Sequence, residues 1–235
     1  MKSLAVIIQA YNEVESLPDT LLKVVTECGK LPCLWKIIIV DDGSSDGTGE
    51  RADKLARNHP DVSVIHHPTN MGMGAALKSG FEAADADYLT SIPADGQLDP
   101  AELRHLLEAM READFVTTRR KHPYKQWSRR MLTRCLQAFM VCLFGFVPRQ
   151  EAGRMFRREI LQHLELTSTS AVLNLELIVK AHRLGCRFKE IPMELLEREK
   201  GTSKIASVKG VWRMIRELVK LRLSKSYRSL KRIRS

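Results

Sequence analysis

The sequence predicts an α/β protein built on a doubly wound, mostly parallel sheet. Short apolar runs rich in β-branched residues alternate four times with segments of helical period, and the links between them are short. The run Ile-Ile-Ile-Val at residues 37–40 is apolar at every position, which is typical of a strand buried on both faces of a parallel sheet. Parallel strands joined through helices form right-handed βαβ units, and such units build a doubly wound sheet.

The elements expected before residue 119 follow from this alternation. Apolar runs predict strands at residues 4–9, 37–40, 62–65, 88–92 and 115–118. The first helix is expected after Ser16, with Pro18 in its first turn, and the second after Asp46 or Thr48, because Ser, Asp and Thr are good N-caps. A third helix, rich in small residues, follows residues 70–74, and a fourth begins at Asp99 with a first-turn proline.

The alternation stops after Thr118. Residues 119–130 are strongly basic and turn-like, and residues 131–147 form a mostly apolar helical stretch. A helix is expected over 173–184 with Gly185 at its C-terminal end, followed by a late strand over 187–196. The last segment, from about Ser207, has the pattern of a basic amphipathic helix. We therefore expect a domain of residues 1–205 and a basic C-terminal helix and tail of residues 206–235.

Composition restricts the partners of the chain. The 235 residues are enough for one full core, and the formal net charge of +10 favours anionic partners such as nucleic acid, anionic lipid or phosphorylated substrates. The longest apolar runs are too short for a membrane span, and the first strand begins too early for a signal peptide. Five scattered cysteines without metal-ligand spacing indicate reduced thiols in a cytoplasmic protein.

Acidic residues follow three of the predicted strands. Glu13 comes after the first strand, Asp41 and Asp42 after the second, and Asp95 after the fourth. Parallel strands bring these positions to one edge of the sheet, where α/β proteins bind ligands, so the pattern predicts a pocket for a nucleotide and a metal. Gly72 and Gly74, near Lys78, would allow a ligand or a neighbouring strand to approach closely. These glycines match neither a dinucleotide fingerprint nor a phosphate loop, which excludes dehydrogenase and P-loop NTPase readings.

Several motifs in a fixed order resemble family 2 glycosyltransferases of the GT-A fold. They are AYNE at 10–13, VDDGSSDGT at 40–48, NMGMGAA at 70–76 and ADGQ at 94–97, the last of which resembles a metal-binding DxD-type loop. Residues 176–204 resemble the closing segment of polyprenyl-phosphate sugar synthases, with Arg198, Gly201, Ser203 and Lys204 matching an R-x-x-G-x-S-K element. The resemblance spans roughly residues 4–205.

The resemblance implies roles for named residues. Asp41 or Asp42 would bind the base and ribose of a nucleotide sugar, and Asp95 with Gln97 would hold Mg²⁺ or Mn²⁺ against its diphosphate. Arg119 and Arg130 would bind an anionic acceptor, with Asp95, Arg119 and Glu151 as the catalytic set. The remaining donor-pocket residues implied by the resemblance are Ala10, Tyr11, Glu13, Lys78, Ala94, Arg198 and Lys204.

The chain departs from the family pattern at two positions. Pro93 replaces the first acid of the usual DxD triplet, so Asp95 would hold the metal together with water and diphosphate oxygens. Arg149 stands where the family often has an aspartate, which leaves Glu151 as the nearest candidate base. A hydroxyl acceptor needs such a base, whereas a lipid phosphate, whose second pKa lies near 6, is largely a dianion at neutral pH. The second departure therefore favours a phosphate acceptor.

The basic segments predict contact with a membrane surface. After Glu217 the sequence has no acid, while Lys225, Arg228, Lys231, Arg232 and Arg234 follow. The apolar residues 138–147 fit either the core or an interfacial helix, and the terminal helix fits either a docked helix or an anchor. Because an apolar insertion plus a polybasic patch gives stable anchoring, we expect peripheral attachment to the anionic cytoplasmic face of the membrane.

The leading hypothesis is an inverting, metal-dependent glycosyltransferase that moves a hexose from a UDP- or GDP-sugar to a polyprenyl phosphate. One alternative is a transferase of the same fold that acts on a lipid or glycan hydroxyl. Another is a non-catalytic nucleotide-binding protein, which Pro93 keeps open. A nucleic-acid-binding protein is disfavoured, because the basic residues lie apart from the acidic strand edge and no recognition helix or aromatic stacking motif is present. The sequence does not give the oligomeric state.

Overall fold

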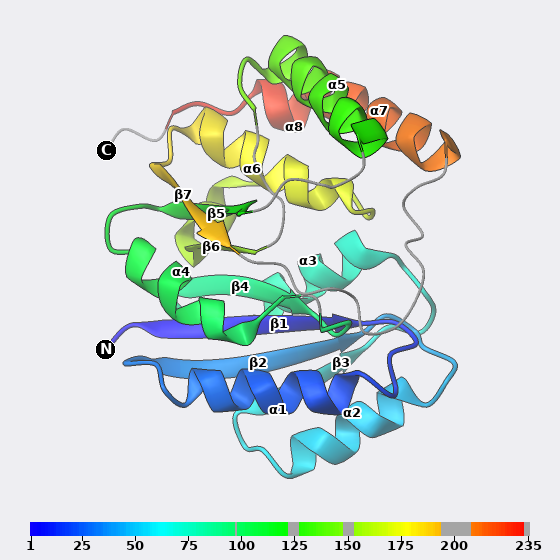
Figure 1. Cartoon of the computed structure of the whole chain (residues 1–235), viewed down its shortest axis with the longest axis vertical. Helices are drawn as coiled ribbons and strands as arrows, with labels where there is room; N and C mark the ends of the chain where they lie inside the picture. The colour runs from blue at the N-terminus through cyan, green and yellow to red at the C-terminus, as the bar shows by residue number, and fades with distance from the viewer. Residues whose placement is uncertain (97, 122–126, 148–152, 194–207, 233–235) are drawn as a thin grey trace.

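The computed structural model of the chain describes residues 1–96, 98–121, 127–147, 153–193 and 208–232. In these residues one seven-stranded sheet has the order β3-β2-β1-β4-β6-β5-β7 (Figure 1). The strands are β1 Ser3–Ala10, β2 Leu34–Asp41, β3 Val62–His66, β4 Tyr88–Pro93, β5 Phe115–Arg120, β6 Arg154–Arg157 and β7 Phe188–Met193. Only β6 pairs antiparallel, with β4 and with β5. The predicted doubly wound, mostly parallel sheet is confirmed.

Helices cover both faces of the sheet and add an outer layer. They are α1 Leu17–Cys28, α2 Thr48–Arg57, α3 Met73–Ala83, α4 Leu103–Ala109, α5 Trp127–Phe144, α6 Val172–Leu184, α7 Val208–Leu223 and α8 Lys225–Arg228, with short 3-10 turns at Pro100–Glu102 and Arg158–His163. α1, α2 and α4 pack on one face, and α3 and α6 pack on the other. α5, α7 and α8 lie beyond α6 at the top of the molecule in Figure 1.

Strand β2 is buried on both faces, as its sequence predicts. Ile37 and Ile39 belong to the core under α1, α2 and α4, whereas Ile38 and Val40 belong to the core under α3 and α6. All four side chains are at most 6% exposed. Burying one such side chain contributes roughly 1.5–3 kcal/mol, so this run is a major anchor of the sheet.

Of the three predicted N-caps, only Asp99 makes the capping bond: its carboxylate accepts the N–H of Ala101. The prediction of Asp46 or Thr48 for α2 is wrong, because the N-cap is Gly47 with a φ of +92°; the Asp46 carboxylate accepts the N–H of Thr48 from outside the helix. Ser16 stands at the N-cap of α1 as expected but makes no capping bond, and its hydroxyl donates to Glu13 Oε2 at 2.5 Å instead. The positive φ of Gly185 at the end of α6 confirms the predicted C-terminal glycine.

The short strand β6 was not recognised in the sequence. It has four residues, too few for a clear alternation of apolar and polar side chains, and it begins with a charged arginine. The Thr90 hydroxyl donates to the backbone oxygen of Arg154, and the Thr118 hydroxyl bonds both the N–H and the C=O of Gly153. These bonds hold β6 between β4 and β5.

The C-terminal helix α7 packs against α5 and α6. Leu218 and Leu221 of α7 and Tyr227 of α8 are buried and join Met140 of α5 in a third core cluster. The helical period of the sequence predicts Trp212 and Leu218 on one apolar face of this helix. Leu218 is buried but Trp212 is 62% exposed, so the buried side of α7 is rotated relative to the predicted face. Within the described residues, no helix is long and apolar enough to cross a membrane.

Candidate functional site

The carboxyl ends of β1, β2 and β4 meet at one edge of the sheet. Ala10 pairs with Asp41, and Gln9 pairs with Pro93. The ladder continues one residue beyond the strands, because Asp42 donates its N–H to Ala10 and Ala94 donates its N–H to Gln9. The chain segments that follow the three strands, which carry Tyr11, Asp42 and Asp95, therefore begin next to one another. This is the convergence that the sequence pattern predicts.

Asp42 holds the loop that precedes α3. Its side chain is 3% exposed, and its two oxygens accept the N–H groups of Met71 at 2.9 Å and Gly72 at 2.8 Å. His67 Nδ1 lies 2.8 Å from the same carboxylate, and His67 Nε2 lies 2.9 Å from the Ser79 hydroxyl. A carboxylate has about four acceptor positions, so most of the capacity of Asp42 is used within the protein.

Asp41 organises the turn after β2. One oxygen accepts the N–H of Ser44 at 3.1 Å, and the other lies 3.2 Å from His66 Nδ1. His66 Nε2 lies 3.0 Å from Asp53, and hydrogen bonds to Asp53 and to Asp41 raise the pKa of His66. Asp41 is 5% exposed, and among the residues that the structure describes it has fewer hydrogen-bond partners than Asp42.

The loops after β1 and β2 are joined by a set of hydrogen bonds that the sequence did not reveal. Asn12 has a φ of +54°; it donates its N–H to Ser44 Oγ and accepts the N–H of Ser45. Glu13 donates its N–H to Thr48 Oγ1 at 2.9 Å. Adjacent to these bonds, Tyr11 is 38% exposed. The sequence feature that could have indicated these bonds is the short polar side chains after both strands, because such side chains commonly form hydrogen bonds to the backbone of loops.

The glycines before α3 admit a neighbouring segment of the chain. A Cβ on Gly74 would lie 2.4 Å from the backbone oxygen of Ser170, and one on Gly72 would lie 2.8 Å from that of Thr169. Gly74 also donates its N–H to the Thr169 oxygen at 2.9 Å. The sequence predicts that these glycines admit either a ligand or another part of the chain. The structure shows the second, the close approach of another backbone segment.

A buried ion pair in α6 holds that neighbouring segment in place. Glu176 and Lys180 are both fully buried, with 2.6 Å between Lys180 Nζ and Glu176 Oε1. Glu176 also accepts the N–H groups of Thr167 and Ser168, and Lys180 donates to Ser226 in α8. Burial alone would raise the pKa of Glu176, but the bonds from Lys180 and Ser168 hold that pKa below its usual value. Glu176 therefore stays ionised, and the pair connects α6 and α8 to the segment beside Gly72 and Gly74.

Asp95 stands at the end of β4, partly buried and next to Gly96, whose φ is +71°. Among the described residues no group of three or more His, Cys, Asp or Glu side chains is arranged to hold a metal. Mg²⁺ is commonly bound by one or two carboxylates together with substrate phosphates and water. The carboxylate of Asp95 therefore fits a metal that binds together with a nucleotide diphosphate. Gln97, the second predicted metal ligand, lies outside the described residues.

The other predicted site residues divide into three groups. Arg119 is at the carboxyl end of β5, on the same edge, half-exposed, with Nε 3.2 Å from Glu190 on β7. Lys78 lies on α3 with Nζ 3.8 Å from Glu82. The described residues do not include Glu151, Arg198, Lys204 or the side chain of Arg130.

A buried arginine near this edge was missed by sequence reasoning. Arg154 begins β6, is 3% exposed, and donates from a guanidinium nitrogen to Ser91 Oγ at 2.9 Å. Burial lowers the pKa of Arg154 to about 10, which leaves it charged at neutral pH. The only signal was an arginine between Gly153 and an apolar pair, a pattern too short to interpret.

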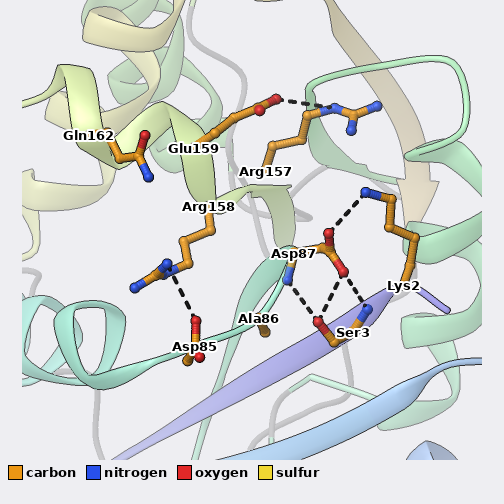
Figure 2. Close-up of a pocket in the computed structure, with 9 residues that line it drawn as sticks. All are labelled: Lys2, Ser3, Asp85, Ala86, Asp87, Arg157, Arg158, Glu159 and Gln162. Atoms are coloured by element: carbon orange, nitrogen blue, oxygen red, sulfur yellow. Dashed lines mark hydrogen bonds and ion pairs between the residues drawn. The ribbon is translucent and has the colours of Figure 1, made fainter.

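A cavity of about 380 Å³ lies at the opposite, amino-terminal edge of the sheet. Figure 2 shows the side chains that line it. Its cations pair with its acids: Lys2 with Asp87, and Arg158 with Asp85. The bonds from Lys2 and Ser3 lower the pKa of Asp87 to about 2. This cavity contains none of the motif residues, and its charges are balanced internally, so it is not the candidate site.

The fold is an α/β sheet whose motif residues gather at the carboxyl edge of β1, β2 and β4. Residues 5–169 match Glycosyl transferase family 2. The chain belongs to this family, and the protein is a glycosyltransferase, as the motifs predict.

Relatives support this assignment. The chain is 34% identical over 213 residues to an undecaprenyl-phosphate mannosyltransferase of Micrococcus luteus, covering 85% of this chain and 86% of that protein. It is also 34% identical to a polyprenol monophosphomannose synthase of Mycolicibacterium smegmatis, covering 86% of this chain and 80% of that protein. An undecaprenyl-phosphate 4-deoxy-4-formamido-L-arabinose transferase of Proteus mirabilis is 30% identical, and the match covers 64% of its length.

Solved structures share the fold at lower identity. A glucosyl-3-phosphoglycerate synthase of Mycobacterium tuberculosis, in complex with Mn²⁺, UDP and glucosyl-3-phosphoglycerate, superposes with a TM-score of 0.68 at 18% identity, covering 96% of this chain and 80% of that one. A mannosyl-3-phosphoglycerate synthase of Rubrobacter xylanophilus gives a TM-score of 0.70 at 16% identity, covering 94% and 73%. These likenesses confirm the predicted GT-A architecture.

Proposed function

We propose that the protein transfers a hexose from a UDP- or GDP-sugar to a polyprenyl phosphate, with inversion at the sugar and with help from a divalent cation. The observation that carries this proposal is the convergence of Ala10, Asp41 and Ala94 at one sheet edge, followed directly by Asp95. Membership of the glycosyltransferase family supports the assignment of the donor to that edge. Two relatives named for transfer of mannose to lipid phosphates, each 34% identical over most of the chain, support the acceptor class.

For the donor base we propose Asp41 rather than Asp42 as the contact. Asp42 already accepts hydrogen bonds from Met71 and Gly72 and lies against His67, whereas Asp41 retains more acceptor capacity. Asp42 would then act indirectly by shaping the loop before α3. Ala10, Tyr11, Glu13 and Ala94 would line the remainder of the base and ribose site, with Lys78 toward the phosphates.

The leaving diphosphate requires positive charge. A cation held by Asp95 and Gln97, Mg²⁺ or Mn²⁺, would neutralise the diphosphate as the bond to the sugar breaks. The role of the Asp95 carboxylate would be to hold this cation next to the diphosphate. Arg198 and Lys204 would add hydrogen-bond donors to the same group.

Arg119 is proposed to position the acceptor, together with Arg130. An acceptor phosphate oxygen would attack the anomeric carbon on the face opposite the departing diphosphate, and a single displacement of this kind inverts the configuration. The phosphate is a dianion at neutral pH, so the step needs no general base. With a hydroxyl acceptor, Glu151 would have to accept the proton.

A radiolabelled transfer assay tests this proposal. Purified protein is incubated with UDP-glucose, UDP-N-acetylglucosamine or GDP-mannose, a short polyprenyl phosphate, and Mg²⁺ or Mn²⁺. We expect a chloroform-soluble labelled product with one donor, absent when EDTA is added and absent in Asp95→Ala. Donor turnover without lipid product would move the acceptor to a hydroxyl, and no turnover with any donor would overturn the proposal.

The acceptor class also bears on where the protein works. Polyprenyl phosphates reside in membranes, so we propose that residues 1–205 form the catalytic domain and that residues 206–235 help to hold it at the cytoplasmic membrane face.

A further inference from the structure

Helix α5 has two distinct faces: its inner face is buried, and its outer face is exposed. The inner face, with Leu136, Met140 and Leu143, packs in the third core cluster. On the outer face Trp127 is 75% exposed, Met131 46% and Val141 44%. Cys135, Ala138 and Cys142 are exposed on the same side, Arg134 adds one cation there, and α5 contains no acidic residue. A mostly apolar helix face left open to water over more than three turns is unusual and generally marks an interaction surface.

Helix α7 presents a basic face to solvent. Arg213, Arg216 and Lys220 are exposed, together with Trp212 at 62% and Leu223 at 66%. The single acid of α7, Glu217, points inward, where it accepts the hydroxyl of Ser170 at 2.5 Å. The outer side of α7 therefore combines cations with a tryptophan and a leucine and has no negative charge.

α5 and α7 contact each other and form the outermost layer of the molecule (Figure 1). We infer that the exposed residues of these two helices, here called the α5–α7 face, lie on an anionic lipid bilayer, with the apolar residues of α5 in the acyl boundary and the basic residues of α7 at the headgroups. The inference goes beyond the proposed reaction and rests on it only in that a polyprenyl-phosphate acceptor resides in a bilayer. It also refines the expected anchor, because α5 supplies most of the exposed apolar side chains.

Charge favours lipid over a second copy of the chain as the occupant. In a two-fold dimer through this face, the basic residues of one copy would lie near those of the other, and like charges at an interface are costly. An anionic leaflet instead attracts each basic residue near its surface by about 1 kcal/mol, or roughly fivefold in affinity. Tryptophans on both helices match the preference of this side chain for the membrane–water interface.

Vesicle flotation of the full-length protein tests the inference. Vesicles of pure phosphatidylcholine are compared with vesicles that contain about one third phosphatidylglycerol. The test variants are Val141→Asp in α5 and the double charge reversal Arg213→Glu with Lys220→Glu in α7. Their matched controls are Leu22→Asp, at a position 61% exposed on α1, and Lys23→Glu with Lys54→Glu on α1 and α2.

We expect the wild type and both controls to bind anionic vesicles, with binding that weakens as salt is added. Each test variant should bind at least tenfold more weakly while its melting temperature stays within the range of the controls. Equal binding by test and control variants, or no binding by the wild type, would overturn the inference. A concentration-dependent dimer that Val141→Asp abolishes would assign the face to a second copy instead.

Transfer by the wild type to a short, water-soluble polyprenyl phosphate, measured without vesicles, separates this inference from the proposed function. If that transfer is absent while vesicle binding behaves as expected, the reaction is wrong and the docking face stands. If transfer occurs while vesicle binding is insensitive to the variants, the reaction stands and the docking face is wrong.

Discussion

Asp41 and Asp42 are equivalent in the sequence and differ in the structure. Asp41 holds the turn after β2 and lies against His66, whereas Asp42 holds the loop before α3 and lies against His67. Apart from Ser44, which follows Asp41 directly in the turn, their partners come from β3 and the loop after it, 25 to 30 residues away. A local pattern indicates that acids follow a strand, but it does not indicate which segments those acids will bind. The choice between the two residues therefore needed the structure.

His66 should make stability depend on pH. Its pKa is raised above the reference value of 6.5, mainly by the bond to Asp53 and then by the bond to Asp41. The stabilisation from this residue is thus fully present below pH 6.5 and is lost as the pH rises through the raised folded-state pKa. We expect the melting-temperature difference between wild type and His66→Asn to shrink across that interval. A difference that grows with pH would contradict the assignment.

The buried pair in α6 should be sensitive to loss of either partner. Glu176→Ala would leave the Lys180 amino group fully buried and without its carboxylate partner, at a cost of about 3–5 kcal/mol in the free energy of unfolding. Urea unfolding measures this cost. The control is Glu82→Ala, which removes an exposed carboxylate 3.8 Å from Lys78 and should change stability by no more than about 0.5 kcal/mol. Similar values for the two variants would contradict the structural role of Glu176.

At the scale of elements, glycines before α3 set how closely the segment 167–170 approaches. Gly74→Ala should destabilise the protein by about 1–3 kcal/mol, since the new methyl group would meet the backbone of Thr169 and Ser170. Gly29→Ala is the matched control. Gly29 has a φ of −62°, its added Cβ would lie 3.4 Å from the nearest atom, and the substitution should be neutral or stabilising by up to about 1 kcal/mol. Thermal unfolding of both variants distinguishes steric contact from a general loss of glycine flexibility.

Strands and helices could be predicted where a long local pattern specifies them. β1, β2, β4 and α1 follow from apolar runs and helical period, and their bounds agree with the expectations within a few residues. β6 escaped prediction because four residues give no periodicity and because threonines on β4 and β5 hold it in place. The rotation of α7 escaped prediction for a related reason. Its buried side is chosen by packing on α5 and α6, which the sequence of α7 alone does not contain.

At the scale of the molecule, the sheet separates two tasks. The carboxyl edge of β1, β2 and β4 gathers the donor residues, while α5, α7 and α8 form a layer on the far side of α6. The edge was predictable from strand polarity, because acids placed after parallel strands must meet. The layer of α5, α7 and α8 was not predictable, because an apolar helical run has the same sequence pattern whether it faces the core or a partner. Ser170 connects the two regions, since it lies beside Gly74 and bonds to Glu217 of α7.

Calorimetric binding of UDP and GDP, with and without Mn²⁺, tests most directly whether this sheet edge is the donor site. The wild type should bind one of the two nucleotides, and the metal should tighten that binding at least tenfold. Asp95→Asn should abolish the metal effect, and Asp61→Asn, an exposed aspartate before β3 at the opposite edge, should leave it unchanged. Metal-dependent binding that survives in Asp95→Asn, or that is absent from the wild type, would contradict the account.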